Sequence, residues 1–141
     1  MRYFLILMII LWAGLSYAEE IEVEMLNKLN NEYMVYSKKI VKVDVGDTVF
    51  WKATDASHNV EFIKGAVPEG VESFKSKLNK DVSYEFKIPG IYAYWCTPHK
   101  SLGMIGFVIV GNDLSNIDEI SNVRYFGKSK KVAEELIEQF L

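Results

Sequence analysis

Residues 96–104 read Cys96-Thr97-Pro98-His99-Lys100-Ser101-Leu102-Gly103-Met104. The stretches on either side, residues 91–95 and 106–110, are rich in β-branched and aromatic residues, which predicts a short loop between two strands. A cysteine that ends one strand and a methionine that opens the next can face one point across such a loop. The segment therefore predicts a cluster of sulfur and nitrogen donors in a protein built from strands.

A further donor is His58, in the segment Ser57-His58-Asn59-Val60, and the whole chain has two histidines and one cysteine. Each of these residues alone could be ordinary core, but together they match one pattern. A thiolate and two imidazoles in a plane, with a thioether at longer range, form a blue-copper site. Zinc rarely takes a thioether, and its structural sites prefer four Cys or His ligands. The sequence thus predicts one copper ion bound by His58, Cys96, His99 and Met104.

Much of the chain alternates with the period of a strand that has one buried face. Val41, Val43 and Val45 alternate with charged residues. Glycine-containing turns at residues 45–47 and 89–90 separate such segments. We expect a mainly β protein with a meander or Greek-key sheet, and with further strands at residues 21–26, 48–52, 59–63, 82–86 and 91–95.

The C-terminal part has a different pattern. Residues 106–110 form a continuous apolar stretch, which predicts a strand covered on both faces. A short helix is expected near residues 114–120, and Ser129 is expected to cap a second helix. The apolar residues of that second helix recur every four positions, at Val132, Leu136 and Phe140. These helices are expected to pack on the strands.

The N-terminal residues have the layout of a secretory signal peptide: Arg2, an apolar run over residues 3–15, and the small-residue ending Ser16-Tyr17-Ala18. We expect cleavage after Ala18, which leaves 123 of the 141 residues, enough for one domain. Removing Arg2 leaves 15 basic against 19 acidic residues, a net charge of −4, which disfavours nucleic acid as a partner. One cysteine cannot form an internal disulfide, so Cys96 is either inert or functional.

Several segments resemble the pseudoazurins, small periplasmic cupredoxins of bacteria. The resemblance rests on Val23-Glu24-Met25-Leu26-Asn27-Lys28, Gly46-Asp47-Thr48-Val49, His58-Asn59-Val60-Glu61, Pro68-Glu69-Gly70, Phe74-Lys75-Ser76-Lys77 and the 96–104 loop. It implies an eight-stranded Greek-key β-sandwich with copper at one end and two C-terminal α-helices. The expected organisation is a signal peptide at 1–18, the sandwich at 19–111 and a helical extension at 112–141.

The resemblance also implies roles around the copper. The backbone N–H of Asn59 would reach the Cys96 sulfur, and its side chain would tie the two ligand loops together. Pro98 has no N–H to donate to the thiolate, which would leave the sulfur more electron-rich. The family usually carries a basic residue before the cysteine, where this chain has Trp95. Strand alternation points Trp95 away from copper.

The expected function is that of a periplasmic one-electron carrier, monomeric, serving a redox partner such as a nitrite reductase or a cytochrome. An enzyme would need a second copper centre, and both histidines are already used. A copper chaperone or storage protein is the alternative, although methionine-rich and multiple-cysteine clusters are missing from the sequence. Two groups of residues are expected to contact the partner. The apolar group is Leu102, Gly103 and Ile105, and the basic group is Lys64, Lys75, Lys77 and Lys100.

Overall fold

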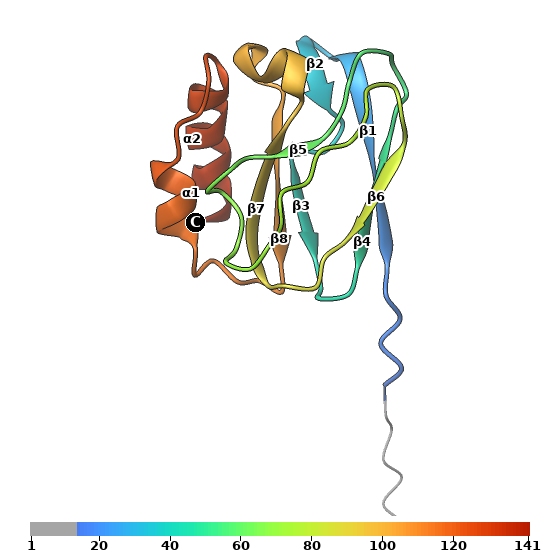
Figure 1. The fold of residues 1–141 in the computed structure, drawn as a ribbon, viewed down its shortest axis with the longest axis vertical. Coiled ribbons are helices and arrows are strands. Elements are labelled where there is room, and N and C mark those ends of the chain that lie inside the picture. The colour runs from blue at the N-terminus through green and yellow to red at the C-terminus, as the bar shows by residue number, and fades with distance from the viewer. Residues whose placement is uncertain (1–13) are drawn as a thin grey trace, which may run out of the picture.

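The computed structural model describes residues 14–141, and these form two facing four-stranded sheets with helices against one side (Figure 1). One sheet has the strand order β2-β1-β4-β6, with β1 at Glu20–Leu29, β2 at Glu32–Tyr36, β4 at Thr48–Lys52 and β6 at Val82–Glu85. The other has the order β3-β8-β7-β5, with β3 at Ile40–Val43, β5 at Glu61–Phe62, β7 at Gly90–Trp95 and β8 at Ile105–Val110. The mainly β, eight-stranded prediction is confirmed.

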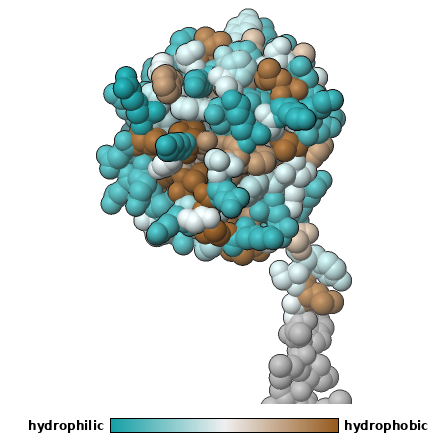
Figure 2. Space-filling view, viewed as in Figure 1, coloured by the Kyte–Doolittle hydropathy of each residue, from teal (hydrophilic) through white to brown (hydrophobic). Residues whose placement is uncertain are grey.

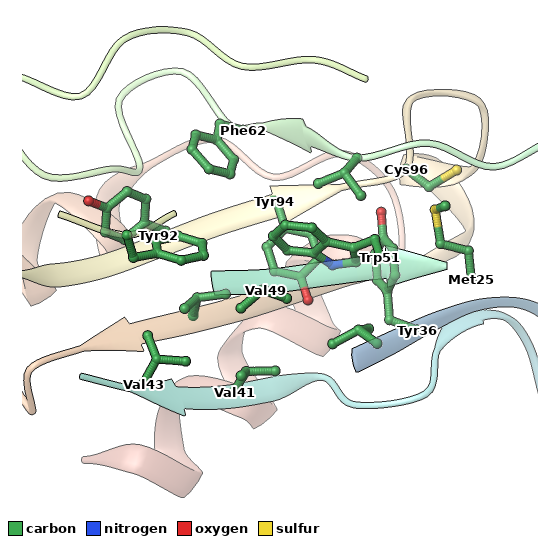
Figure 3. Packing of buried hydrophobic residues seen from close by; sticks show 14 of the residues in the cluster. Met25, Tyr36, Val41, Val43, Val49, Trp51, Phe62, Tyr92, Tyr94 and Cys96 are labelled. Carbon is green, nitrogen blue, oxygen red and sulfur yellow. The ribbon is translucent and has the colours of Figure 1, made fainter. Parts of the chain in front are cut away.

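In the segments with alternating residues, every second side chain is buried between the two sheets. Val49 and Trp51 of β4 are fully buried, while Lys52 is exposed. Figure 3 shows this core, with Trp51 beside Tyr94 and with Cys96 at one end of the cluster. The core thus runs up to the predicted donor loop and holds its first residue in place.

A second core lies between the β3-β8-β7-β5 sheet and the two helices, α1 at Ile117–Asn122 and α2 at Ser129–Phe140. Leu136 and Phe140 are buried there, and the Phe140 ring lies 5.5 Å from that of Phe107. Every residue of β8 is buried, because the sheet core covers one face and the helices cover the other. The continuous apolar stretch was therefore interpreted correctly.

Two local predictions were incomplete or wrong. The strand β2 was not identified from the sequence pattern, although it pairs with β1 through a tight turn in which Asn30 has a positive φ of 54°. Ser129 does not cap α2. It is the first residue of the helix, and its hydroxyl donates to the carbonyl of Lys100 instead, so it joins α2 to the donor loop.

The donor loop and residues 14–19 lie at opposite ends of the sandwich. The loop forms a short 3-10 helix, η1 at Thr97–Leu102, at the same end as β2, and residues 14–19 leave from the other end (Figure 1). Residues 1–13, which hold most of the predicted signal peptide, lie outside the described residues. Among residues 14–141, no helix has the length and apolar character needed to cross a bilayer. Hydrophilic residues cover much of the face in Figure 2, with hydrophobic patches between them.

Candidate metal centre

The loop between β7 and β8 folds back on itself, which brings its donors together. The Cys96 N–H donates to the Met104 carbonyl at 3.0 Å, and the His99 N–H donates to the Cys96 carbonyl at 3.1 Å. Pro98 lies in the first turn of this 3-10 helix, where a missing N–H has no cost, and Gly103 ends the helix with a φ of 89°. Cys96, His99 and Met104 therefore belong to one closed turn.

The C-terminal helix α2 holds this turn from outside. Besides the Ser129 bond, the Lys128 N–H donates to the Ser101 carbonyl at 3.0 Å. Gly127 packs so closely that a Cβ there would lie 2.6 Å from the Ser101 carbonyl oxygen. These contacts satisfy loop carbonyls and restrict the loop to one conformation.

His58 comes from the segment between β4 and β5. Its carbonyl accepts the Asn79 N–H at 3.1 Å, and the Ser57 N–H donates to the Asn79 side chain at 2.5 Å. Ser57 has a positive φ of 73°, which turns the chain sharply just before the histidine. His58 is buried and reaches the donors of the η1 loop only because the two sheets face each other.

The donor atoms fit a single small ion. His58 Nδ1 lies 3.1 Å from His99 Nδ1, and Cys96 Sγ lies 3.7 Å and 3.4 Å from these two nitrogens. Ligand bonds of about 2.0–2.3 Å to one ion, at angles between tetrahedral and trigonal, place such atoms about 3–4 Å apart. Met104 is fully buried in the same core cluster as Cys96. The chemistry of this set, S, N, N and a thioether, is that of type 1 copper.

Hydrogen bonding sets the protonation of His58. Its Nε2 lies 2.8 Å from the Asn27 amide oxygen, which can only accept, so Nε2 carries the proton. The Nδ1 lone pair then faces Cys96 and is available to a metal. Burial also lowers the pKa of both His58 and His99 below the ordinary value near 6.5. The nearby charge of His99 lowers the pKa of His58 further, and Asp55 opposes this effect. Both imidazoles are thus favoured as neutral ligands.

The sulfur lies in an apolar setting with two polar contacts. Burial raises the pKa of the Cys96 thiol, and hydrogen bonds from the backbone N–H groups of Asn59 and His99 oppose this. A bound copper ion supplies the positive charge that the thiolate needs and, as the redox centre, takes up and releases one electron.

Asn59 makes hydrogen bonds through its side chain and its backbone carbonyl. Its amide nitrogen donates to Thr97 Oγ1 at 2.8 Å and to the Ser76 carbonyl at 3.2 Å, and its amide oxygen accepts the Thr97 N–H at 2.7 Å. The buried Tyr36 hydroxyl donates to the Asn59 carbonyl at 2.8 Å. The His58 segment and the Cys96 loop are therefore connected by several hydrogen bonds.

Sequence reasoning missed three polar partners of the site: Asn27, Tyr36 and Thr97. Asn27 and Thr97 lie inside segments that resemble the pseudoazurins, and this position could have indicated that they lie near the metal site. Tyr36 lies in the strand β2, which the pattern did not reveal. Its role depends on a contact between residues 23 positions apart.

The predicted partner-contact residues divide into exposed and buried ones. Leu102 is 51% exposed, and Gly103 and His99 are partly exposed beside it. Ile105 is 1% exposed, so its assignment to the contact surface was wrong: it opens β8 and packs into the core under the helices. Of the predicted apolar contact residues, Leu102 and Gly103 are therefore the ones that a partner could reach.

The lysines also differ among themselves. Lys64 and Lys77 are exposed, and Lys75 is exposed with its Nζ 4.0 Å from Glu61. Lys100 is only partly exposed, because its Nζ lies 5.0 Å from the Trp95 ring centre and 4.7 Å from that of Phe126. Trp95 itself is 6% exposed and packs in the outer core, facing away from the Cys96 side of β7.

Comparisons with known proteins agree with this geometry. Residues 23–111 match the family model of copper binding proteins, plastocyanin/azurin family. The chain is 41% identical over 119 residues to a pseudoazurin of Paracoccus pantotrophus, covering 84% of this chain and 82% of the relative. The structure superposes with a TM-score of 0.82 on a pseudoazurin from Sinorhizobium meliloti, at 38% identity with 86% and 95% of the two chains covered. For native pseudoazurin from Hyphomicrobium denitrificans the TM-score is 0.81, at 37% identity with 85% and 97% covered.

The fold, the donor set and these likenesses lead to one assignment. Copper is the cofactor, and His58, Cys96, His99 and Met104 form its type 1 site. Proteins of this kind transfer electrons and do not catalyse substrate turnover. The chain belongs to the pseudoazurins, within the plastocyanin/azurin family of copper-binding electron carriers.

Proposed function

We propose that this chain is a periplasmic carrier that delivers single electrons to a redox protein such as a copper nitrite reductase or a cytochrome, and that it acts as a monomer. The observation that carries the proposal is the position of His99. It contributes Nδ1 to the donor set and is partly exposed next to Leu102 and Gly103. An electron can therefore pass from copper through one ligand into a partner that docks on this apolar patch.

Export is supported by the sequence of residues 1–18, which has the layout of a secretory signal peptide. We propose that the mature protein begins at Glu19. Residues 14–20 are exposed, so a peptidase could reach the bond after Ala18. Mass spectrometry of protein from a periplasmic fraction would give the N-terminus directly, and retention of residues 1–18 would reject the proposal.

A chaperone or storage role would need copper to exchange easily. Cys96, His58 and Met104 are each 0% exposed, so releasing the ion would require the loop to open. The contacts between α2 and the loop oppose such opening. The burial of the ligands favours a carrier that keeps its metal, and slow transfer of copper to a competing chelator would support it.

We propose that Lys75 and Lys77, with Lys64, steer an acidic partner toward the patch. The segment that holds Lys75 and Lys77 lies beside the segment that follows His58, since the Ser76 N–H donates to the Val60 carbonyl at 2.8 Å. Changing Lys75 and Lys77 to Glu should slow electron transfer to an acidic acceptor roughly tenfold or more at low salt. Stopped-flow rates at increasing salt would converge, because ions screen charges beyond about 8 Å at physiological ionic strength.

The matched control changes Lys42 and Lys87 to Glu. Both are exposed, and β-sheet register places Lys42 opposite Ile109, far from the loop end of β8. This variant has the same net charge and should retain the normal rate. Equal slowing in both variants would show that total charge matters and that the lysines near the ligands have no special role.

Met104 is proposed as the axial ligand, which leads to a prediction for the potential. Met104→Leu should keep the visible colour, because the thiolate and imidazoles remain, and should raise the reduction potential, because a lost thioether weakens Cu(II) more than Cu(I). The swap conserves volume, so it should cost under about 1.5 kcal/mol of stability. Voltammetry would check it, and an unchanged potential would argue against axial ligation.

The absence of an N–H at Pro98 is proposed to leave the Cys96 thiolate with fewer hydrogen bonds. The sulfur accepts from the backbone N–H groups of Asn59 and His99. A residue with an N–H at position 98 would offer the sulfur one more hydrogen-bond donor. That bond would draw electron density from the thiolate and weaken the electron donation from sulfur that stabilises Cu(II). We therefore propose that Pro98 keeps the potential lower than it would otherwise be.

A further inference from the structure

Glu61 is a carboxylate held close to the copper site by neutral donors. Its Oε2 accepts the Thr97 hydroxyl at 2.7 Å and the Trp95 indole N–H at 3.1 Å, and its side chain is 27% exposed. Within residues 14–141, Glu61 forms one ion pair, in which Lys75 Nζ lies 4.0 Å from Glu61 Oε1. The Lys75 side chain is 55% exposed. The negative charge is thus fixed in place but only weakly neutralised.

The hydrogen bonds continue from Glu61 to the copper ligand. The Asn59 amide N–H donates to Thr97 Oγ1, so the proton of the Thr97 hydroxyl is the one that points to Glu61. Thr97 N–H in turn donates to the Asn59 amide oxygen, and the Asn59 backbone N–H donates to the Cys96 sulfur. Glu61 is therefore the charged end of a chain of hydrogen bonds that terminates at the thiolate.

We propose that Glu61 is a positioning residue that lowers the reduction potential of the copper. A fixed negative charge stabilises Cu(II) more than Cu(I), and its partial burial limits screening by water and salt. It also orients Thr97 and through it Asn59, which holds the sulfur. The inference rests on the copper-dependent electron transfer proposed above and adds a residue outside the ligand set that adjusts it.

Glu61→Gln tests the charge with little change of shape, because the glutamine oxygen can accept the same two hydrogen bonds. We expect the potential to rise enough to change the Cu(II):Cu(I) ratio at least threefold at a fixed potential, which is about 28 mV at 59 mV per tenfold change. Glu72→Gln is the matched control: Glu72 is exposed and lines the same groove between residues 61 and 75. The potential of the Glu72→Gln variant should stay within a few millivolts of that of the unmodified protein, well below the shift of about 28 mV expected for Glu61→Gln.

Further variants separate charge from structure. Glu61→Ala should raise the potential like Glu61→Gln, whereas Glu61→Asp keeps the charge and should stay near the unmodified value. In the copper-free protein, the Trp95 indole proton should shift upfield in Glu61→Ala as it loses its acceptor. An intact visible band in each variant shows that the copper site has formed. Loss of the band would instead count against the proposed copper carrier function, and not against the role of Glu61. The proposal is overturned if Glu61→Gln and Glu61→Ala match Glu72→Gln, or if Glu61→Asp shifts as far as they do.

Discussion

Replacing Cys96 by serine should abolish the intense visible absorption expected of the Cu(II) protein. That absorption arises from charge transfer between a cysteine thiolate and copper, and a serine hydroxyl has no comparable donor orbital. Cys96 is the one cysteine of the chain and is fully buried among the donor atoms, so no other thiolate can replace it. We expect loss of the whole band in an absorption spectrum taken after copper addition, whether or not some copper still binds.

Met25→Leu is the matched control for this loss. Met25 is another fully buried sulfur residue, and Figure 3 shows it beside Cys96 at the same end of the core. Exchange of Met for Leu conserves volume and should cost under about 1.5 kcal/mol. This variant should keep the band. A Cys96→Ser protein that remains intensely coloured would reject the ligand assignment at its central atom.

Gly106→Ala should destabilise the fold strongly, although the substitution adds a single methyl group. Gly106 lies directly opposite Tyr94 in the β7–β8 pair. A Cβ at 106 would lie 2.5 Å from the Tyr94 hydroxyl oxygen and 2.6 Å from the ring carbon that carries it. The Tyr94 ring cannot easily move, because it packs at 4.9 Å from Tyr36 and 5.2 Å from Trp51. We expect a loss of about 3 kcal/mol in the free energy of unfolding, at the upper end for overpacked cores.

Urea unfolding of the copper-free protein, followed by circular dichroism, would measure this loss. The Tyr94→Phe variant provides the control, because it removes the nearest clashing atom. Its own cost should be small, since the Tyr94 hydroxyl is buried and makes no hydrogen bond within residues 14–141. Gly106→Ala should then cost less in the Tyr94→Phe background. Equal costs in both backgrounds would show that Tyr94 does not cause the strain.

The ligand set could be predicted because three of its members are close in sequence. Cys96, His99 and Met104 fall within nine residues, and their chemistry admits few metals. His58 was added because the chain has only one other histidine. Buried strands were also readable, because one-sided burial leaves a period of two and two-sided burial leaves a continuous apolar run. Both signals are local.

The errors concern contacts that no local pattern encodes. Ile105 lies one residue beyond the ligand Met104, and the exact start of β8 decides whether its side chain faces a partner or the helices. Lys100 was assigned to the basic contact group from its place in the sequence, which gave no sign that its Nζ lies over Phe126, a residue 26 positions later in the chain. Serine is a residue type that often caps helices, yet the Ser129 hydroxyl donates to the Lys100 carbonyl. In each case the tertiary neighbour decided the outcome.

The position of residues 14–19 has a practical consequence for attaching this protein to a surface. Residues 14–19 leave the sandwich at the end opposite to η1, where His99 and Leu102 reach the surface. A linker fused before Glu20 would therefore immobilise the molecule with its copper end turned toward the solution. Anchoring through the C-terminal residue Leu141 would instead place the tether on α2, the helix that braces the ligand loop.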